Sequence, residues 1–394
     1  MKNLLEGIRV LDFGRYIAGP YAAMVLGDFG ADVIRIERRS GGEDRYTGPV
    51  TDSGEGGLFL NLNRNKRGIT LDPAHARAKP ILERLVRSAD AVIVNLPIDV
   101  MKRLGLDYDS LRAVKPDIIL AMASAFGPDG PYRERLGFDG IVQAMSGMMG
   151  LSGHPDAPIR SIVPWADYGT ALHAAFGVMA ALYHQAQTGE GQLIDVSLLA
   201  TGVMFMTPLL AERATTDKRR VGQGNTGYWS APSDAYRTRD GWLMVPTVGG
   251  PMFRRWARLM QREDLIDDPR CADDTIRGDN HALINEVMSA WTAERTTAEA
   301  MAELEAARIP CGPVQTLDDV LADPQVQARQ LMEEIAWPAS RKPVPLSRPA
   351  VRLGGTPGRI ANRAPKLGEH TDAILNELGF SGDQIAQFRR DQVI

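Results

Sequence analysis

The chain has 394 residues, 44% of them hydrophobic and 24% charged, with a formal net charge of −4. This length allows two domains with cores of their own, and the charge balance gives no electrostatic footprint for nucleic acid or an anionic membrane. No apolar run reaches the roughly 18 residues of a membrane span, the first residues do not read as a signal peptide, and the two cysteines have no metal-binding spacing, so we expect a cytoplasmic protein.

Strands and helices alternate through the first 125 residues. Predicted strands cover residues 8–14, 32–37, 68–72, 91–96 and 116–125, and predicted helices cover residues 20–30 and 76–88. This alternation predicts an α/β fold with a doubly wound parallel sheet. Ligands of such sheets bind beyond the carboxyl ends of the strands, where Arg38, Asn95 and Ser124 stand.

Arg38 and Arg39 follow the second predicted strand. At this place dinucleotide-binding enzymes recognise a ribose or its phosphate, so paired arginines fit an adenine nucleotide with an extra ribose phosphate. The alternative is a solvent-exposed charge pair beside Glu37. The first strand-to-helix turn, at 14–20, lacks the glycine spacing of a dinucleotide fingerprint.

Residues 164–200 predict a loop, a helix, a glycine stop at 188–191 and a strand over 192–199. Apolar side chains at helical spacing predict the face of this helix that packs on the core: Leu172, Ala175, Phe176, Met179, Leu182 and Tyr183. Asp167 stands just ahead of the helix, where free N–H groups and the helix dipole favour an ionised carboxylate. Two roles stay open on these grounds, an N-cap and a carboxylate nucleophile.

A Gly-x-Gly-x-x-Gly pattern occurs at 222–227. No buried strand precedes it and no helix follows it, so it is not predicted to bind a dinucleotide. We interpret this segment, which includes Gly224, as a mobile glycine loop over a site. The six histidines are scattered, and neither an HExxH motif nor a nucleophile elbow is present, so neither a metal site nor a serine triad is predicted.

The pattern changes after residue 234. Two strands, at 234–237 and 242–245, bracket the turn Arg239-Asp-Gly241, and helices are predicted near 251–261, 280–291 and 297–307. This combination indicates a separate, smaller α+β domain. The flanking residues 209–220 are charged, and residues 341–365 are rich in Pro, Gly and Arg, so both are predicted to be linkers or long surface crossings.

Six blocks of this sequence resemble the family III CoA-transferases, in family order. They are LEGIRVLDFGRYIAGPYAAMVLGDFGADVIRIE, NRNKRGITLD, FGPDGPYRERLGFDGIVQAMSG, DYGTALHAAFGVMAALYHQAQTGEGQLIDVSL, IPCGPV and APKLGEHTDAIL. The family holds formyl-CoA and carnitine CoA-transferases together with 2-methylacyl-CoA racemases. The resemblance covers nearly the whole chain.

The resemblance implies a homodimer of two ring-like chains threaded through each other. Each chain would have a Rossmann-type large domain over 1–205, a linker over 206–225, a small α+β domain over 226–320 and a second linker over 321–360. A C-terminal segment over 361–394 would complete the large domain.

The resemblance also implies the chemistry. Asp167 stands at the place of the family's catalytic aspartate, and Arg38, Leu71, Asn95 and Arg103 match positions that bind CoA. The expected reaction moves CoA from an acyl-CoA to a carboxylic acid through an acyl–aspartyl anhydride and an aspartyl–CoA thioester. Backbone N–H groups at a helix N-terminus or a glycine loop would stabilise each oxyanion. CoA would be a substrate, with no tightly bound cofactor.

Two departures from the family concern the acyl pocket. Relatives that act on oxalate carry glutamine where this chain has Ile17, and their glycine-rich loop is longer. Tyr16 and Ile17 therefore suit a larger acid, such as a short dicarboxylate. Phe138 is expected either in the core or as a wall of the acyl pocket.

Three alternatives to CoA transfer remain on the sequence alone. A 2-methylacyl-CoA racemase needs an acid–base pair across the α-carbon, but Phe138 stands where racemases carry histidine, and Asp139 is expected to point elsewhere. The second is a CoA-binding protein without activity, and the third is an NAD-dependent oxidoreductase.

Overall fold

The computed structural model describes residues 3–394, and their contacts divide the chain into two compact units. The first comprises Met1–Ser146, Ser161–Thr207 and Gln327–Ile394, and the second comprises Gly147–Arg160 and Pro208–Val326. Helix α9 (Leu198–Thr215) continues through the boundary at residue 207. A helix therefore occupies residues 209–215, where the sequence predicted the start of a linker.

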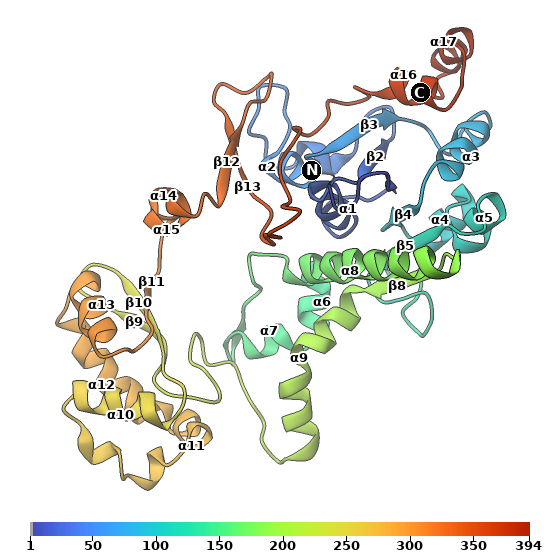
Figure 1. The fold of residues 1–394 in the computed structure, drawn as a ribbon. Coiled ribbons are helices and arrows are strands. Elements are labelled where there is room, and N and C mark those ends of the chain that lie inside the picture. The colour runs from blue at the N-terminus through green and yellow to red at the C-terminus, as the bar shows by residue number, and fades with distance from the viewer. Residues whose placement is uncertain (1–2) are drawn as a thin grey trace. The chain divides into compact units, whose positions relative to one another are not determined.

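The first unit is built on six parallel strands in the order β3-β2-β1-β4-β5-β8 (Figure 1). This is the strand order of a doubly wound nucleotide-binding sheet, so the predicted α/β fold is confirmed. Parallel strands buried on both faces read as continuous apolar runs, and all four residues of β4 are buried. The strands are β1 (Arg9–Asp12), β2 (Asp32–Glu37), β3 (Lys66–Thr70), β4 (Ala91–Val94), β5 (Ile119–Ser124) and β8 (Leu193–Ser197).

Helices α1 (Ala18–Asp28) and α8 (Trp165–Thr188) pack side by side on one face of the sheet (Figure 1). Their contact is made by small side chains, including Ala22, Ala23, Ala171 and Ala174, all fully buried. The face predicted for α8 was therefore wrong in part. Its larger members Leu172, Phe176 and Tyr183 are 50%, 74% and 70% exposed, because the buried side of α8 is the one that carries Ala171, Ala174, Ala175 and Val178.

The opposite face of the sheet is covered by helices from both ends of the chain. Their apolar side chains form one core with β1, β2, β4 and β5, and residues 374–394 contribute Ile374, Leu375, Phe380, Ile385, Phe388, Val393 and Ile394 to it. The helices are α3 (Lys79–Arg87), α4 (Ile98–Leu104), α5 (Tyr108–Val114), α16 (Thr371–Glu377) and α17 (Gly382–Arg390).

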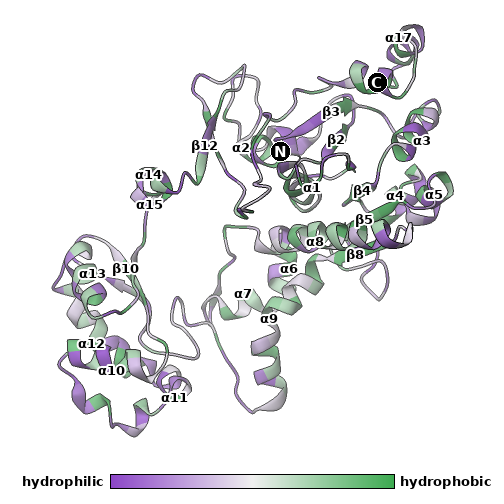
Figure 2. Cartoon of the chain, in the orientation of Figure 1, coloured by the Kyte–Doolittle hydropathy of each residue, from purple (hydrophilic) through white to green (hydrophobic). Residues whose placement is uncertain are grey.

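A smaller cluster joins α2 (Gly57–Leu62) to the hairpin of β12 (Met332–Ile335) and β13 (Val344–Ser347), through Phe59, Leu60, Trp337 and Leu346. Helix α6 (Asp139–Met145) lies beside the N-terminal turn of α8. Figure 2 shows that α8 and α9 carry mostly apolar residues along their length. No helix within residues 3–394 combines the length and hydropathy needed to cross a membrane.

The second unit has an antiparallel sheet of β9 (Ser233–Arg237), β10 (Trp242–Pro246) and β11 (Gly312–Pro313). Helices pack on it around the buried Trp256, Phe253 and Leu243. The predicted strand pair and helices of the α+β region are present. The remaining α-helices and strands are α7 (Met148–Leu151), β6 (Gly153–His154), β7 (Ala157–Pro158), α10 (Gly250–Leu259), α11 (Asp274–Asp279), α12 (His281–Ala293), α13 (Thr297–Ala306), α14 (Leu317–Ala322) and α15 (Pro324–Ala328).

Candidate active site

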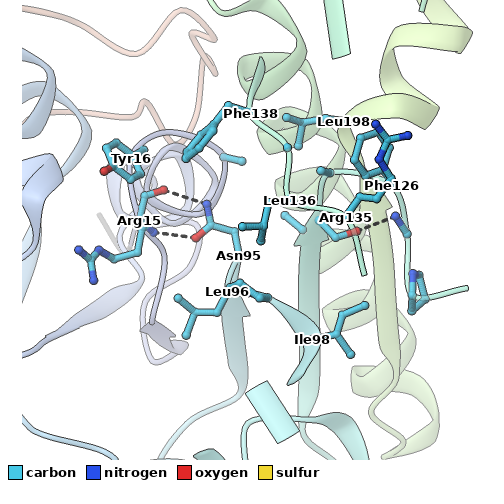
Figure 3. A pocket seen from close by; sticks show the side chains of 18 of the residues that line it. Arg15, Tyr16, Asn95, Leu96, Ile98, Phe126, Arg135, Leu136, Phe138 and Leu198 are labelled. Carbon is cyan, nitrogen blue, oxygen red and sulfur yellow. Dashed lines mark hydrogen bonds between the residues drawn. The ribbon is translucent and has the colours of Figure 1, made fainter. Parts of the chain in front are cut away.

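A cavity of about 960 Å³ opens in the first unit, beyond the carboxyl ends of β1, β4 and β5 (Figure 3). This volume is in the upper range of small-molecule sites. The lining comes from the loops that follow the strands, together with Asp167 of α8 and Leu198 of α9. The position is the one that the doubly wound sheet predicts for a ligand.

Asn95 holds the first loop of the cavity in place. Its Oδ1 accepts a hydrogen bond from the backbone N–H of Arg15 at 2.7 Å, and its Nδ2 donates to the Arg15 carbonyl at 2.8 Å (Figure 3). The next residue, Tyr16, has a φ of 57°, a conformation that costs energy for a non-glycine residue. Both polar atoms of the Asn95 side chain therefore help to fix the conformation of the loop that contains Tyr16 and Ile17.

The residues predicted for the acyl pocket meet at this loop. Tyr16, Ile17 and Phe138 all line the cavity, and the Tyr16 and Phe138 rings lie edge to face with centroids 5.9 Å apart (Figure 3). Phe138 is 65% exposed, so it is a wall of the cavity and does not belong to the core. The apolar members Leu96, Ile98, Leu136 and Leu198 complete this side.

The cations that line the cavity are Arg15, Arg38, Lys102, Arg133 and Arg135. Arg15 and Arg38 both form ion pairs with the exposed Glu43. Arg15 is also held by Asp44, at 3.2 Å, and the buried Arg35 binds the same carboxylate at 2.7 Å. Arg15, Lys102, Arg133 and Arg135 were not predicted from the sequence; for Arg15 and Lys102, only their places after β1 and on α4 could have indicated them.

Three predicted site residues do not line this cavity. Leu71 is fully buried in the core cluster of the sheet. Arg103 is exposed on α4, with Asp99 at 3.8 Å, and its neighbour Lys102 faces the cavity instead. Gly224 belongs to the second unit, where it has a φ of +68° beside the His154 ring. The roles assigned to these three residues stay predictions.

Asp167 is the third residue of α8 and not its N-cap. The helix begins at Trp165 and Pro164 is the capping residue, so the N-cap interpretation is wrong. The half-buried Asp167 contributes to the cavity lining. Within residues 3–394, no side-chain or backbone donor makes a hydrogen bond to its carboxylate.

Asp139, the first residue of α6, occupies the place where a cap of α8 would act. Its Oδ1 accepts hydrogen bonds from the backbone N–H groups of Ala166 at 2.8 Å and Asp167 at 3.3 Å. Asp139 is not among the residues that line the cavity, so nothing contradicts the expectation that it points away from the acyl site. Its carboxylate lies against the start of α8 instead, because α6 packs there. The contact between Asp139 and the start of α8 could not be predicted from sequence spacing, because it depends on how α6 packs against α8.

The electrostatics of Asp167 also differ from the expectation. Burial, and then the neighbouring Asp139 carboxylate, raise the pKa of Asp167 to about 7. The helix N-terminus does not offset these effects, because Asp139 already binds the amides that would have faced Asp167. The carboxylate is therefore only partly ionised at neutral pH.

Free backbone N–H groups are found at the start of α1. In the first turn of α8, the N–H groups of Trp165 and Tyr168 donate to Val163 and Pro164 carbonyls, and the two between them donate to Asp139. On α1, by contrast, the N–H groups of Ala18 and Gly19 have no partner within the described chain, and Ala18 lines the cavity. No cluster of metal-binding side chains occurs among residues 3–394.

Comparison with known proteins gives a consistent result. The model of CoA-transferase family III matches residues 5–371. The chain is 33% identical to the succinate–glutarate CoA-transferase of Agrobacterium fabrum, over 96% of each chain. It is 32% identical to the succinyl-CoA–D-citramalate CoA-transferase of Chloroflexus aurantiacus, over 99% of this chain and 98% of that one. A crystal structure of a CAIB/BAIF family protein from Brucella suis superposes with a TM-score of 0.83 at 32% identity, over 96% of this chain and all of that one.

Proposed function

The chain belongs to CoA-transferase family III, and we propose that it moves CoA between two short dicarboxylic acids with Asp167 as the covalent carrier. The observation that carries the proposal is a half-buried carboxylate on a large cavity at the carboxyl edge of the sheet. Relatives that use succinyl-CoA with glutarate or citramalate support the class of acid. The apolar Tyr16 and Ile17 leave room for more than oxalate.

The first half of the reaction loads CoA onto the protein. A carboxylate oxygen of Asp167 attacks the thioester carbonyl of the donor, the C–S bond breaks, and CoA leaves as a thiolate, which forms a mixed anhydride. The thiolate then attacks the Asp167 carbonyl. The anhydride C–O bond breaks, the donor acid leaves as a carboxylate, and an aspartyl–CoA thioester remains.

The second half reverses these steps with the acceptor. The acceptor carboxylate attacks the aspartyl thioester, which expels CoA thiolate and forms a second anhydride. The thiolate attacks the acceptor acyl carbon, and Asp167 leaves as a carboxylate. Each tetrahedral oxyanion needs hydrogen-bond donors. The unpaired backbone N–H groups of Ala18 and Gly19 on α1 are the donors that we propose for this role.

The cationic residues of the cavity support CoA as the ligand. Arg38 follows β2, where an extra ribose phosphate is bound in sheets of this kind, and Arg15 and Lys102 add positive charge. The phosphate would replace Glu43 as the partner of Arg38. Both cysteines are free thiols, which agrees with the cytoplasmic location we propose.

We also propose that the active enzyme is a homodimer. The support is an exposed apolar stripe on α8, formed by Leu172, Phe176 and Tyr183, which lie within about 40° of one another on the helix. Monomeric proteins seldom leave such stripes open to water. A second copy of this chain is the partner we expect.

The test combines succinyl-CoA with a panel of dicarboxylic acids and identifies the CoA thioesters by mass spectrometry. Wild type should form the acceptor thioester, and Asp167→Ala should not. Hydroxylamine added with the acyl-CoA should modify wild type at Asp167. Substantial transfer by Asp167→Ala would contradict the proposed carrier.

A second experiment tests for racemase activity. Incubation with a 2-methylacyl-CoA in heavy water, without an acceptor acid, should leave the α-hydrogen in place, because Phe138 cannot carry a proton and Asp139 is engaged by the α8 amides. Deuterium incorporated at enzymatic rates would favour the racemase.

A further inference from the structure

Asp139 is a buried carboxylate that the proposed reaction does not use. It is 6% exposed, and burying an ionised carboxylate is costly unless its oxygens accept hydrogen bonds. Three donors supply them: the backbone N–H groups of Ala166 and Asp167 at Oδ1, and the Gln143 Nε2 at Oδ2, at 2.5 Å. No arginine, lysine or histidine pairs with Asp139 within the described residues.

Gln143 extends this contact to the segment that leads into α8. Its side chain is fully buried one turn after Asp139 on α6, and its Oε1 accepts a hydrogen bond from the Ser161 N–H at 2.9 Å. One amide therefore bridges Asp139 and Ser161. Asp139 and Gln143 together attach two segments to α6: the residue Ser161, which precedes α8, and the first turn of α8.

We propose that Asp139 is a positioning residue for Asp167: it fixes the first turn of α8 and withholds the amides of that turn from the Asp167 carboxylate. This inference rests on the proposed function, in which Asp167 is the nucleophile. It assigns Asp139 no contact with substrate.

The consequence concerns the reactivity of the nucleophile. A carboxylate that accepts several hydrogen bonds is stabilised as the anion and is a weaker nucleophile. Asp167 accepts none in the described chain, and the amides closest to it in sequence belong to Asp139. The backbone at Asp167 is thus fixed by Asp139, while the ionised Asp167 carboxylate has no hydrogen-bond donors that would stabilise it before it attacks.

The raised pKa of Asp167 agrees with this arrangement, with burial as its main cause and Asp139 as its second. Charged side chains also line the cavity, among them Arg15, Arg38, Glu43, Lys102, Arg133 and Arg135, but Asp139 is the one whose charge raises the pKa of Asp167. The titratable side chains beside Asp167 on α8 and α1 are tyrosines. Tyr168 follows it on α8, and Tyr21 of α1 packs edge to face on Tyr168 with centroids 5.0 Å apart. Asp139 is therefore the charged group to change.

The test compares three proteins: wild type, Asp139→Ala and the double variant Asp139→Asn/Gln143→Glu. In the double variant, the asparagine oxygen can accept from both α8 amides, and its Nδ2 can donate to the new glutamate. The glutamate can still accept from the Ser161 N–H. The hydrogen bonds to the two α8 amides and from the Ser161 N–H are kept, and the one between residues 139 and 143 is reversed. Only the long contact from Gln143 Nε2 to the Ser161 carbonyl, at 3.5 Å, is lost, while the negative charge moves one helical turn away from Asp167.

Asp139→Ala should lower kcat by about 10²-fold, the loss that follows from a misplaced reacting group, with little change in the KM for acyl-CoA. The double variant should recover most of that kcat at pH 9. Its acidic limb in the pH profile of kcat should lie at lower pH than that of wild type. A merely structural role for Asp139 would change stability without moving this limb.

A readout without turnover separates this inference from the proposed function. In protein with ¹³C-labelled aspartate carboxyls, the Asp167 signal, assigned by its loss in Asp167→Asn, should titrate at lower pH in the double variant than in wild type. If the Asp167 titration and the kcat of Asp139→Ala both equal those of wild type, the inference is wrong. Absence of CoA transfer in wild type with a shifted titration would instead contradict the proposed function alone.

Discussion

At the scale of single residues, the ionisation of Asp167 links stability to pH. Its pKa is raised to about 7 in the folded chain, while an aspartate in an unfolded chain titrates near 3.9. The folded state thus binds this proton more tightly. The resulting stability is complete below about pH 4 and is lost as the pH rises through about 7.

Asp167→Asn should therefore gain stability relative to wild type as the pH rises. Between pH 5 and pH 8 the difference in the free energy of unfolding, variant minus wild type, should increase by roughly 1–3 kcal/mol, after allowance for solvent screening of a half-buried group. Urea unfolding at the two pH values measures it. Asp156→Asn, at an exposed turn, is the control and should show no such increase.

Arg38 and Arg103 make a matched pair for testing the CoA site, because only Arg38 lines the cavity. A charge-assisted phosphate contact contributes roughly 1.5–3 kcal/mol. Arg38→Ala should raise the KM for acyl-CoA at least several-fold and reduce discrimination between CoA and dephospho-CoA. Arg103→Ala should do neither, because Arg103 is exposed on α4 and does not line the cavity. The reverse pattern would assign the 3′-phosphate to Arg103.

The residues that sequence reasoning could find were those with a local signature. Asp167 lies in the first turn of a helix and Arg38 and Asn95 follow strands, and each of these side chains reaches the cavity or shapes its wall. Asp139 and Lys102 have no such signature. Their roles depend on the packing of α6 on α8 and on which side of α4 faces the cavity, and both are set by tertiary contacts.

At the scale of elements, the strands were predictable and the buried side of α8 was not. Continuous apolar runs between turn signals located the parallel strands. For α8, the rule that large apolar residues face the core failed, because the helix lies close to α1 through alanines. The pattern that would have indicated this is the recurrence of alanine at 171, 174, 175 and 181.

The close contact between α1 and α8 predicts a specific sensitivity to volume. Ala174→Leu inserts three carbon atoms into a fully buried position and should lower the free energy of unfolding by about 1–3 kcal/mol. Ala186→Leu makes the same change on an exposed part of the same helix and should stay within about 0.5 kcal/mol of wild type. Equal effects in urea unfolding would show that α8 does not pack through its alanines.

At the scale of the whole molecule, the apolar stripe of α8 is a surface that a single chain does not bury. Leu172, Phe176 and Tyr183 are each at least half exposed, although the helix they belong to carries Asp167 at its first turn. A partner that covers this stripe would fix α8 from its outer side, as α1 fixes it from the inner side. Assembly and catalysis would then depend on the same helix.

Phe176→Glu tests this dependence, because it places a charge at the centre of the stripe, where burial against a second copy would leave it without a partner. We expect wild type to have twice the mass of one chain by light scattering, and Phe176→Glu to be monomeric or to dissociate at concentrations where wild type does not. His184→Glu adds the same charge about 120° from Leu172 around the helix and should remain dimeric. Transfer activity should fall with the dimer fraction. A monomeric wild type, or a Phe176→Glu dimer as stable as wild type, would show that this stripe is not the dimer contact.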